Sequence, residues 1–168
     1  MQPTARARYR ARQFFGALRP RIDHARRDEA LARLSDGERA LFASMTPRDQ
    51  QHCLDVFERL RAQGHDDADL LSAALLHDAG KGRIALWHRV AFVVVDASAP
   101  ALLRRVVREG DGGSWRETLY RCVHHNEIGA RQARGAGSSE RVVALIRGDK
   151  NAALREPLAA LAAADDAS

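Results

Sequence analysis

Apolar positions along the chain follow the spacing of helices almost throughout. The clearest case lies between Thr46 and Gly64, where apolar residues recur at intervals of three and four and so share one helical face. These residues are Cys53, Val56, Phe57 and Leu60. Thr46-Pro47 suits the start, because threonine caps helices and proline fits their first turn. The pattern predicts a helix over 47–63 that Gly64 ends.

The next segment, 67–80, predicts a second helix of a different kind. Its apolar residues surround the helix on nearly all sides, which indicates a central, buried position. They are Leu70, Leu71, Ala73, Ala74, Leu75 and Leu76. We expect this helix to end at Gly80 and to present His77 and Asp78 in its last turn.

The rest of the chain also has helical spacing, and strand signals are almost absent. Before residue 46 we predict helices at about 4–18, 21–34 and 36–45. After residue 80 we predict helices at 84–97, 100–109, 115–123, 126–135, 139–147 and 157–164, with a glycine-rich loop at 110–114 and a frayed tail after Asp166. No internal repeat or long linker divides the sequence. We therefore predict an all-α, single-domain helical bundle.

Composition excludes several classes of protein. The chain has 168 residues, of which 45% are hydrophobic and 29% charged, which is typical of one soluble globular domain. Its longest apolar run, Leu158–Ala164, covers seven residues, whereas a membrane-spanning helix needs roughly 20. No signal-peptide pattern is present, so we expect a cytoplasmic protein without a membrane partner. Cys53 and Cys122 are far apart in sequence, which favours reduced thiols.

Basic residues are concentrated near the start of the chain. The net charge is +5, and residues 1–27 carry eight arginines against the single acid Asp23. Such a segment can attract nucleic acid. Arginine also dominates the basic residues elsewhere, and no aromatic stacking pattern accompanies the charge. We therefore interpret this segment as a solvated helix face and expect no nucleic-acid partner.

The dipeptide His77-Asp78 is the strongest candidate for chemistry. A buried carboxylate is costly unless it is paired or bound to a metal, and this helix is otherwise built from leucine and alanine. A short connection joins it to the preceding helix, so antiparallel packing can bring His52 close to His77. Imidazole nitrogen together with carboxylate oxygen suits Zn, Fe, Mn, Co or Ni.

Four stretches of this sequence together resemble the HD-domain superfamily of metal-dependent phosphohydrolases, and the stretches 10–15 and 86–90 resemble its short, stand-alone bacterial members. The four stretches read Asp49-Gln50-Gln51-His52, Ala73-Ala74-Leu75-Leu76-His77-Asp78-Ala79-Gly80-Lys81, His125-Asn126-Glu127-Ile128-Gly129-Ala130 and Ala164-Asp165. The resemblance covers residues 46–166. It implies an all-helical HD domain over that range, with residues 1–45 as a basic helical extension packed on its core.

The resemblance also implies the metal ligands. The family's cluster is an early histidine, a His-Asp pair and a late aspartate. In this sequence these positions are His52, His77, Asp78 and Asp165, or Asp166 in place of the last. The implied cofactor is a divalent metal, namely Mn, Fe, Ni, Co, Zn or Mg. Two-metal members add a late histidine pair, but the stretch 143–150 offers Asp149 without such a pair, so we expect one ion.

By the same resemblance, the substrate is a phosphorylated small molecule, and the family favours a nucleotide. Asp78 would act as a ligand and orient the attacking water, and Lys81 would hold a substrate phosphate as a point charge, so both are catalytic candidates. His125 and Arg147 are candidate substrate contacts. For His125, the roles of metal ligand and of polar residue at a helix start stay open, and for Lys81 so does simple exposure at a helix end.

Two other interpretations are consistent with the sequence. The first is a binding or signalling module that holds metal or nucleotide without turnover, since the late histidine pair is missing. The second is a helical bundle without a site, in which the candidate ligands lie apart. It predicts that the His52 and His77 imidazoles are more than roughly 6 Å apart, because ligands of one metal each lie about 2 Å from it.

Overall fold

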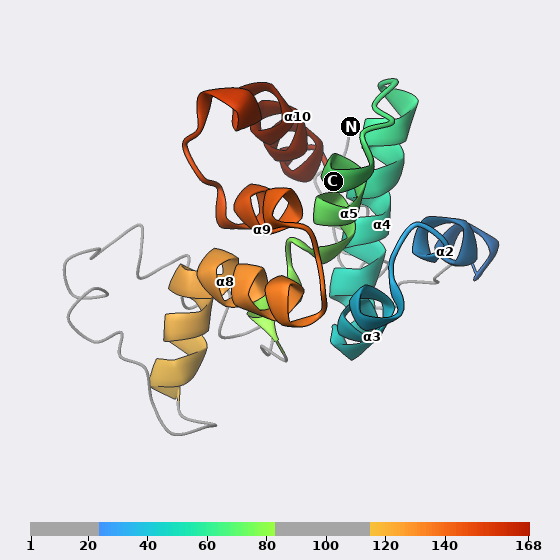
Figure 1. Cartoon of the computed structure of the whole chain (residues 1–168). Coiled ribbons are helices and arrows are strands. Elements are labelled where there is room, and N and C mark those ends of the chain that lie inside the picture. The colour runs from blue at the N-terminus through green and yellow to red at the C-terminus, as the bar shows by residue number, and fades with distance from the viewer. Residues whose placement is uncertain (1–23, 83–114) are drawn as a thin grey trace, which may run out of the picture.

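The computed structural model describes residues 24–82 and 115–168, and throughout these ranges the protein is all-helical without a strand (Figure 1). The α-helices are α2 (His24–Leu31), α3 (Asp36–Ser44), α4 (Pro47–Ala62), α5 (Ala68–Leu76), α8 (Trp115–Gly135), α9 (Glu140–Arg147) and α10 (Arg155–Asp166). The described 3-10 helices are η1 (Ala79–Lys81) and η2 (Ala152–Leu154). The predicted all-α class is confirmed. The elements predicted at 4–18, 84–97, 100–109 and 110–114 lie outside the described residues.

The start of α4 is built as its sequence predicts. Thr46 Oγ1 accepts a hydrogen bond from the backbone N–H of Asp49 at 3.2 Å, and Pro47 occupies the first turn. The Thr46 hydroxyl also donates to the Asp49 carboxylate at 2.6 Å. The apolar face of α4 is buried through Cys53, Val56, Phe57 and Leu60. His52 lies at the edge of this face and is partly buried.

The helices α4 and α5 pack side by side at the centre of the described structure (Figure 1). Every residue of α5 from Leu70 to Leu76 is buried, as its all-round apolar pattern predicts. Helix α10 packs on α4, and α9 packs on α5 and α8. The same core cluster includes Ala30 and Leu31 of α2 and Phe42 of α3. No helix within the described ranges combines the length and apolar character needed to cross a bilayer.

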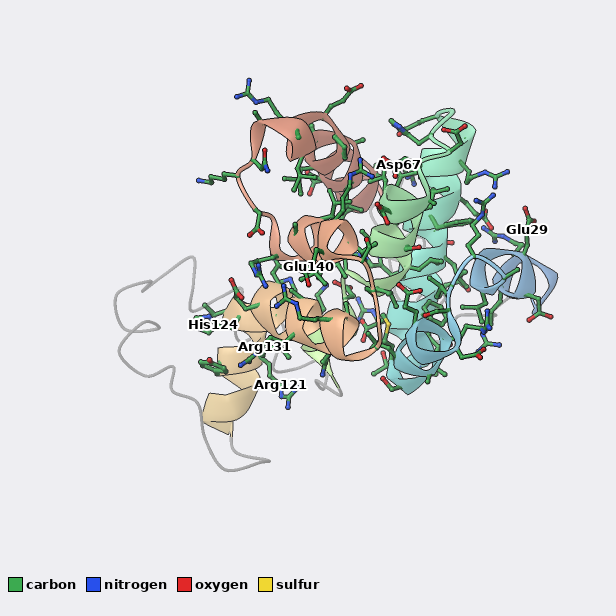
Figure 2. All side chains as sticks on the ribbon, in the orientation of Figure 1. Glu29, Asp67, Arg121, His124, Arg131 and Glu140 are labelled. Carbon is green, nitrogen blue, oxygen red and sulfur yellow. The ribbon has the colours of Figure 1, made fainter. Side chains whose placement is uncertain are left out.

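Polar contacts join the beginning of α5 to the beginning of α9. The Asp67 carboxylate caps α5 by accepting from the backbone N–H groups of Asp69 and Leu70, at 3.0 and 3.2 Å. Arg141 of α9 donates to both oxygens of Asp67, at 2.7 and 2.6 Å, and this hydrogen bonding lowers the pKa of Asp67. Figure 2 shows Asp67 at this end of α5. These contacts fix the position of α9 along α5.

Helix α5 ends earlier than the sequence predicts. Its last helical residue is Leu76, and His77 caps the helix instead of lying in its last turn. Asp78 leaves the helical conformation, with φ −91° and ψ 0°, and the chain then enters η1. The prediction that Gly80 ends the helix is therefore wrong. Gly80 is needed for another reason, because a Cβ there would lie 1.9 Å from the backbone oxygen of His125 in α8.

Gly80→Ala is expected to destabilise the fold and to displace the segment that carries His77. The new methyl group would lie 1.9 Å from the His125 oxygen and 2.5 Å from the Gly129 nitrogen, and backbone atoms cannot rotate away. We expect the free energy of unfolding to fall by about 2–3 kcal/mol, the upper range for overpacking, as measured by urea denaturation. Gly135→Ala is the control, since nothing lies within 4 Å of its Cβ position. Equal stability of the two variants would contradict the close approach.

Helix α8 joins two helices that the sequence predicts as separate. The break expected between 115–123 and 126–135 is a kink at His124, where φ is −111° and ψ is 15°. His125 therefore directly follows the kink, where the second of the two helical segments begins. Helix α10 begins at Arg155, earlier than the predicted start at Pro157, because proline is tolerated in the first turn of a helix.

Candidate metal centre

Four side chains converge beside the C-terminal end of α5. His52 comes from α4, His77 and Asp78 follow α5 directly, and Asp165 stands in the last turn of α10. The Asp165 Oδ1 atom lies 2.8 Å from His52 Nε2 and 3.6 Å from His77 Nε2. Asp78 Oδ1 lies 3.4 Å from His77 Nε2, and Asp78 Oδ2 lies 3.9 Å from His52 Nε2.

These separations fit the binding of one metal ion. Two atoms that are each bound about 2.1 Å from an ion lie at most about 4.2 Å apart. The Nε2–carboxylate distances given above all fall below that limit. His52, His77 and Asp78 thus form a group that can hold a metal ion. The ring centroids of His52 and His77 are 5.4 Å apart, which contradicts the interpretation of a bundle whose candidate ligands lie apart.

Two buried polar atoms of this group have no hydrogen-bond partner among the described residues. They are His77 Nε2 and Asp78 Oδ1, the two atoms that lie 3.4 Å apart. Asp78 is 2% exposed and His77 is 9% exposed. A buried polar atom that is left unsatisfied costs about 1–3 kcal/mol, and more when it is charged. A cation between these atoms would satisfy both.

Contacts behind His77 fix which of its nitrogens faces the cluster. Its Nδ1 lies 2.9 Å from the carbonyl oxygen of Ala74, one turn earlier in α5, and donates a hydrogen bond to it. The Cys53 thiol lies 3.7 Å from the same nitrogen. Nε2 is then the atom available to a metal. No sequence pattern identifies Cys53 or Ala74 as a contact of His77. The only sequence signal is their position, because Cys53 follows His52 directly and Ala74 lies one helical turn before His77.

The two oxygens of Asp78 have different surroundings. Lys81 donates a hydrogen bond from Nζ to Oδ2 at 2.6 Å, while Oδ1 faces His77. Lys81 comes from η1, and its side chain is 25% exposed. An ammonium group has three donors, so two remain for a further acceptor. Oδ2 of Asp78 is thus held by Lys81, and Oδ1 is directed into the cluster.

Mutual attraction shifts the pKa values of the clustered groups in opposite directions. Desolvation by burial lowers the pKa of His77, but Cys53 and the Asp165 and Asp78 carboxylates outweigh it, and the pKa stands well above its ordinary value. Burial raises the pKa of Asp78, but attraction by His77 outweighs it and lowers this pKa. The hydrogen bond with His52 and the neighbouring His77 ring hold the pKa of Asp165 far below its ordinary range. Without a metal, an imidazolium among carboxylates is therefore the favoured arrangement.

Of the two late aspartates, Asp165 is the one whose carboxylate reaches the histidines. Asp166, the neighbouring choice, is exposed at the end of α10. Successive residues of an α-helix point about 100° apart, so the two side chains cannot both face α4. The packing of α10 on α4 therefore places Asp165, and not Asp166, beside the histidines.

The candidate substrate contacts lie on α8 and α9. Arg147 Nε is 3.3 Å from the Glu127 carboxylate, and Arg147 Nη1 is 3.3 Å from that of Asp149. His125 lies directly after the kink of α8, and its backbone oxygen packs against η1. Figure 2 shows the neighbouring His124 on the outer side of α8, away from α4 and α5. The roles of His125 and Arg147 in substrate binding stay predictions.

No family model, curated protein or solved structure matches the chain. The resemblance to the HD-domain superfamily therefore rests on these sequence motifs alone.

Proposed function

We propose that this protein is a divalent-metal-dependent phosphohydrolase of the HD-domain type that acts on a nucleotide or another phosphate ester. One observation carries the proposal. His77 Nε2 and Asp78 Oδ1 are buried, lie 3.4 Å apart and have no hydrogen-bond partner in the described part of the chain. The distances of His52 and Asp165 to these residues fit ligation of the same ion.

The ligand set limits the choice of metal. Two imidazole nitrogens and two carboxylate oxygens suit Mn, Fe, Co, Ni or Zn better than Mg, which prefers oxygen ligands and water. A thiolate takes no part, because burial raises the pKa of the Cys53 thiol, which lies behind His77. One ion is proposed, since residues 24–82 and 115–168 contain a single group of this kind.

A divalent ion held here would make a water molecule more acidic and neutralise charge on phosphoryl oxygens. The chain's own residues would orient that water and bind the phosphate. Asp78 orients the water, while two donors of Lys81 remain for a substrate phosphate as the third holds Asp78. The side chains of His52 and Asp165 are 26% and 44% exposed, which marks the open side of the cluster from which substrate approaches.

A binding module without turnover is the second candidate function. The ion pairs of Arg147 with Glu127 and Asp149 favour it, because they occupy a side chain proposed to contact substrate phosphate. In that case the same cluster holds a metal or a nucleotide as a signal, and no phosphate bond is broken. The two functions differ in turnover and not in metal binding.

Hydrolysis by the metal-loaded protein tests the proposal. Protein loaded with Mn²⁺ or Ni²⁺ is assayed on phosphomonoesters, phosphodiesters and nucleotides, and we expect metal-dependent turnover of at least one class. Asp78→Asn should lower kcat/KM by more than about 100-fold, because it removes a charged ligand and the group that orients water. Lys81→Ala should act mainly through KM if Lys81 contacts the phosphate. His65→Ala is the control, since His65 follows α4 outside the cluster.

The outcomes separate the candidate functions. Metal-dependent activity that survives both His77→Ala and Asp78→Asn would contradict the assignment of the site. Metal and nucleotide binding without turnover of any substrate class would favour the binding module. A purified protein that contains no metal, and that fails to bind added Mn²⁺ or Ni²⁺, would refute both functions.

A further inference from the structure

Asp165 is far more exposed than the other carboxylate of the cluster. Its side chain is 44% exposed, against 2% for Asp78, and it stands in the last turn of α10. Helix ends fray, because their last carbonyl groups have no partner within the helix. The position of Asp165 therefore depends on what holds the end of α10.

Arg59 of α4 binds that end. Its Nη2 donates to the carbonyl oxygen of Ala167 at 2.6 Å, and its Nε donates to Ser168 Oγ at 3.3 Å. Ser168 donates from Oγ to the carbonyl oxygen of Ala164 at 2.7 Å, and from its N–H to that of Asp165 at 3.0 Å. The expectation of a frayed tail is therefore wrong. The guanidinium also opposes the partial negative charge at the C-terminal end of a helix.

Arg59 and His52 contact α10 from the same side of α4. They are seven residues apart, which is about two helical turns. His52 contacts the Asp165 side chain at 2.8 Å, and Arg59 binds the backbone that follows Asp165. The contact with the backbone limits how far the Asp165 side chain can move from His52.

We propose that Arg59 is a positioning residue of the metal site, which holds the Asp165 carboxylate toward His52 and His77 by binding the end of α10. The inference rests on the proposed function, in which Asp165 is a metal ligand. Arg59 acts through the backbone of α10 and not by contact with a ligand atom. The strength of metal binding then depends on a residue outside the cluster.

The remainder of α10 has an anchor of its own. Leu161 and Ala164 belong to the core, at 7% and 0% exposure, and they keep α10 packed on α4 whether or not Arg59 is present. Removal of the Arg59 side chain should then loosen the last turn while α10 stays docked. The expected effect is therefore on metal affinity and not on the fold.

The test is the affinity of the full chain for Mn²⁺ and Ni²⁺, measured by isothermal titration calorimetry. For Arg59→Ala we expect about tenfold weaker binding, the lower limit for residues that support a metal ligand, with a nearly unchanged melting temperature. Arg59→Lys should recover part of the affinity, because lysine can donate to the Ala167 oxygen but lacks the fixed second donor. Arg61→Ala is the matched control, since Arg61 is exposed on the same helix, and it should bind metal as the wild type does.

A double-mutant cycle separates this role from a general loss of structure. With Asp165 already replaced by alanine, Arg59→Ala should weaken metal binding no further, because Arg59 acts through Asp165. Wild-type affinity in Arg59→Ala would overturn the proposal, and so would an equal loss with and without Asp165. Different results would contradict the proposed metal site itself, namely a wild-type chain that binds no metal or a His77→Ala variant that binds it fully.

Discussion

His77→Ala is expected to abolish tight binding of a divalent metal. The substitution removes Nε2, the buried nitrogen that lies 3.4 Å from Asp78 Oδ1 and has no hydrogen-bond partner among the residues described. Residues that merely support a ligand change metal affinity by about 10–100-fold, so the loss of a ligand should exceed about 100-fold. Calorimetric titration with Mn²⁺ or Ni²⁺ measures the change directly.

Thermal unfolding provides a second measurement of the same loss. A ligand that binds only the folded state stabilises it by about 2.7 kcal/mol when its free concentration is 100 times Kd. We expect added metal to raise the melting temperature of the wild type and of His65→Ala, but not that of His77→Ala. An equal rise in His77→Ala would show that the metal binds elsewhere.

The affinity for metal should also rise steeply with pH. Despite burial, Cys53 and the Asp165 and Asp78 carboxylates hold the pKa of His77 well above its ordinary value, so the imidazole keeps its proton to a higher pH than an ordinary histidine does. A metal binds Nε2 only after that proton has left. Each bound ion then releases about one proton, and affinity rises about tenfold per pH unit until the pH exceeds the raised pKa of His77. Titrations at several pH values measure the slope, and an affinity independent of pH would contradict it.

The stability of the metal-free protein should show the opposite trend above neutrality. A raised histidine pKa contributes stability that is full below the ordinary value of about 6.5 and is lost as the pH rises through the raised value. The lowered pKa values of Asp78 and Asp165 contribute above about pH 4 and lose their contribution as the pH falls. Urea denaturation at about pH 6 and about pH 9 checks the sign, and greater stability at the higher pH would argue against it.

Several helices can be predicted from the sequence because their signals act over a few residues. Thr46 and Pro47 are adjacent to the helix that they start, and the apolar face of α4 repeats within that helix. The ends of α3 and α9 agree with their predicted ranges within one residue. Each of these elements depends on contacts between neighbours in sequence, which periodicity and capping describe.

The end of α5 could not be predicted in this way. Glycine after an apolar helix usually indicates its end, but Gly80 is required by the backbone of His125, which belongs to a different helix. The same packing places η1 against α8. Because of this packing, Asp78 lies outside the helix. One of its oxygens accepts a hydrogen bond from Lys81, and the other faces His77.

Periodicity and adjacency are local properties, and they are sufficient to predict the helical class, the buried faces of α4 and α5, and the pairing of His77 with Asp78. Which residues meet that pair depends on tertiary packing. It brings His52 and Asp165 to within 2.8 Å although 113 positions separate them, and it selects Asp165 over Asp166. These outcomes depend on how α10 and α4 rotate to bury their apolar faces against each other, and no single segment of the chain specifies that rotation.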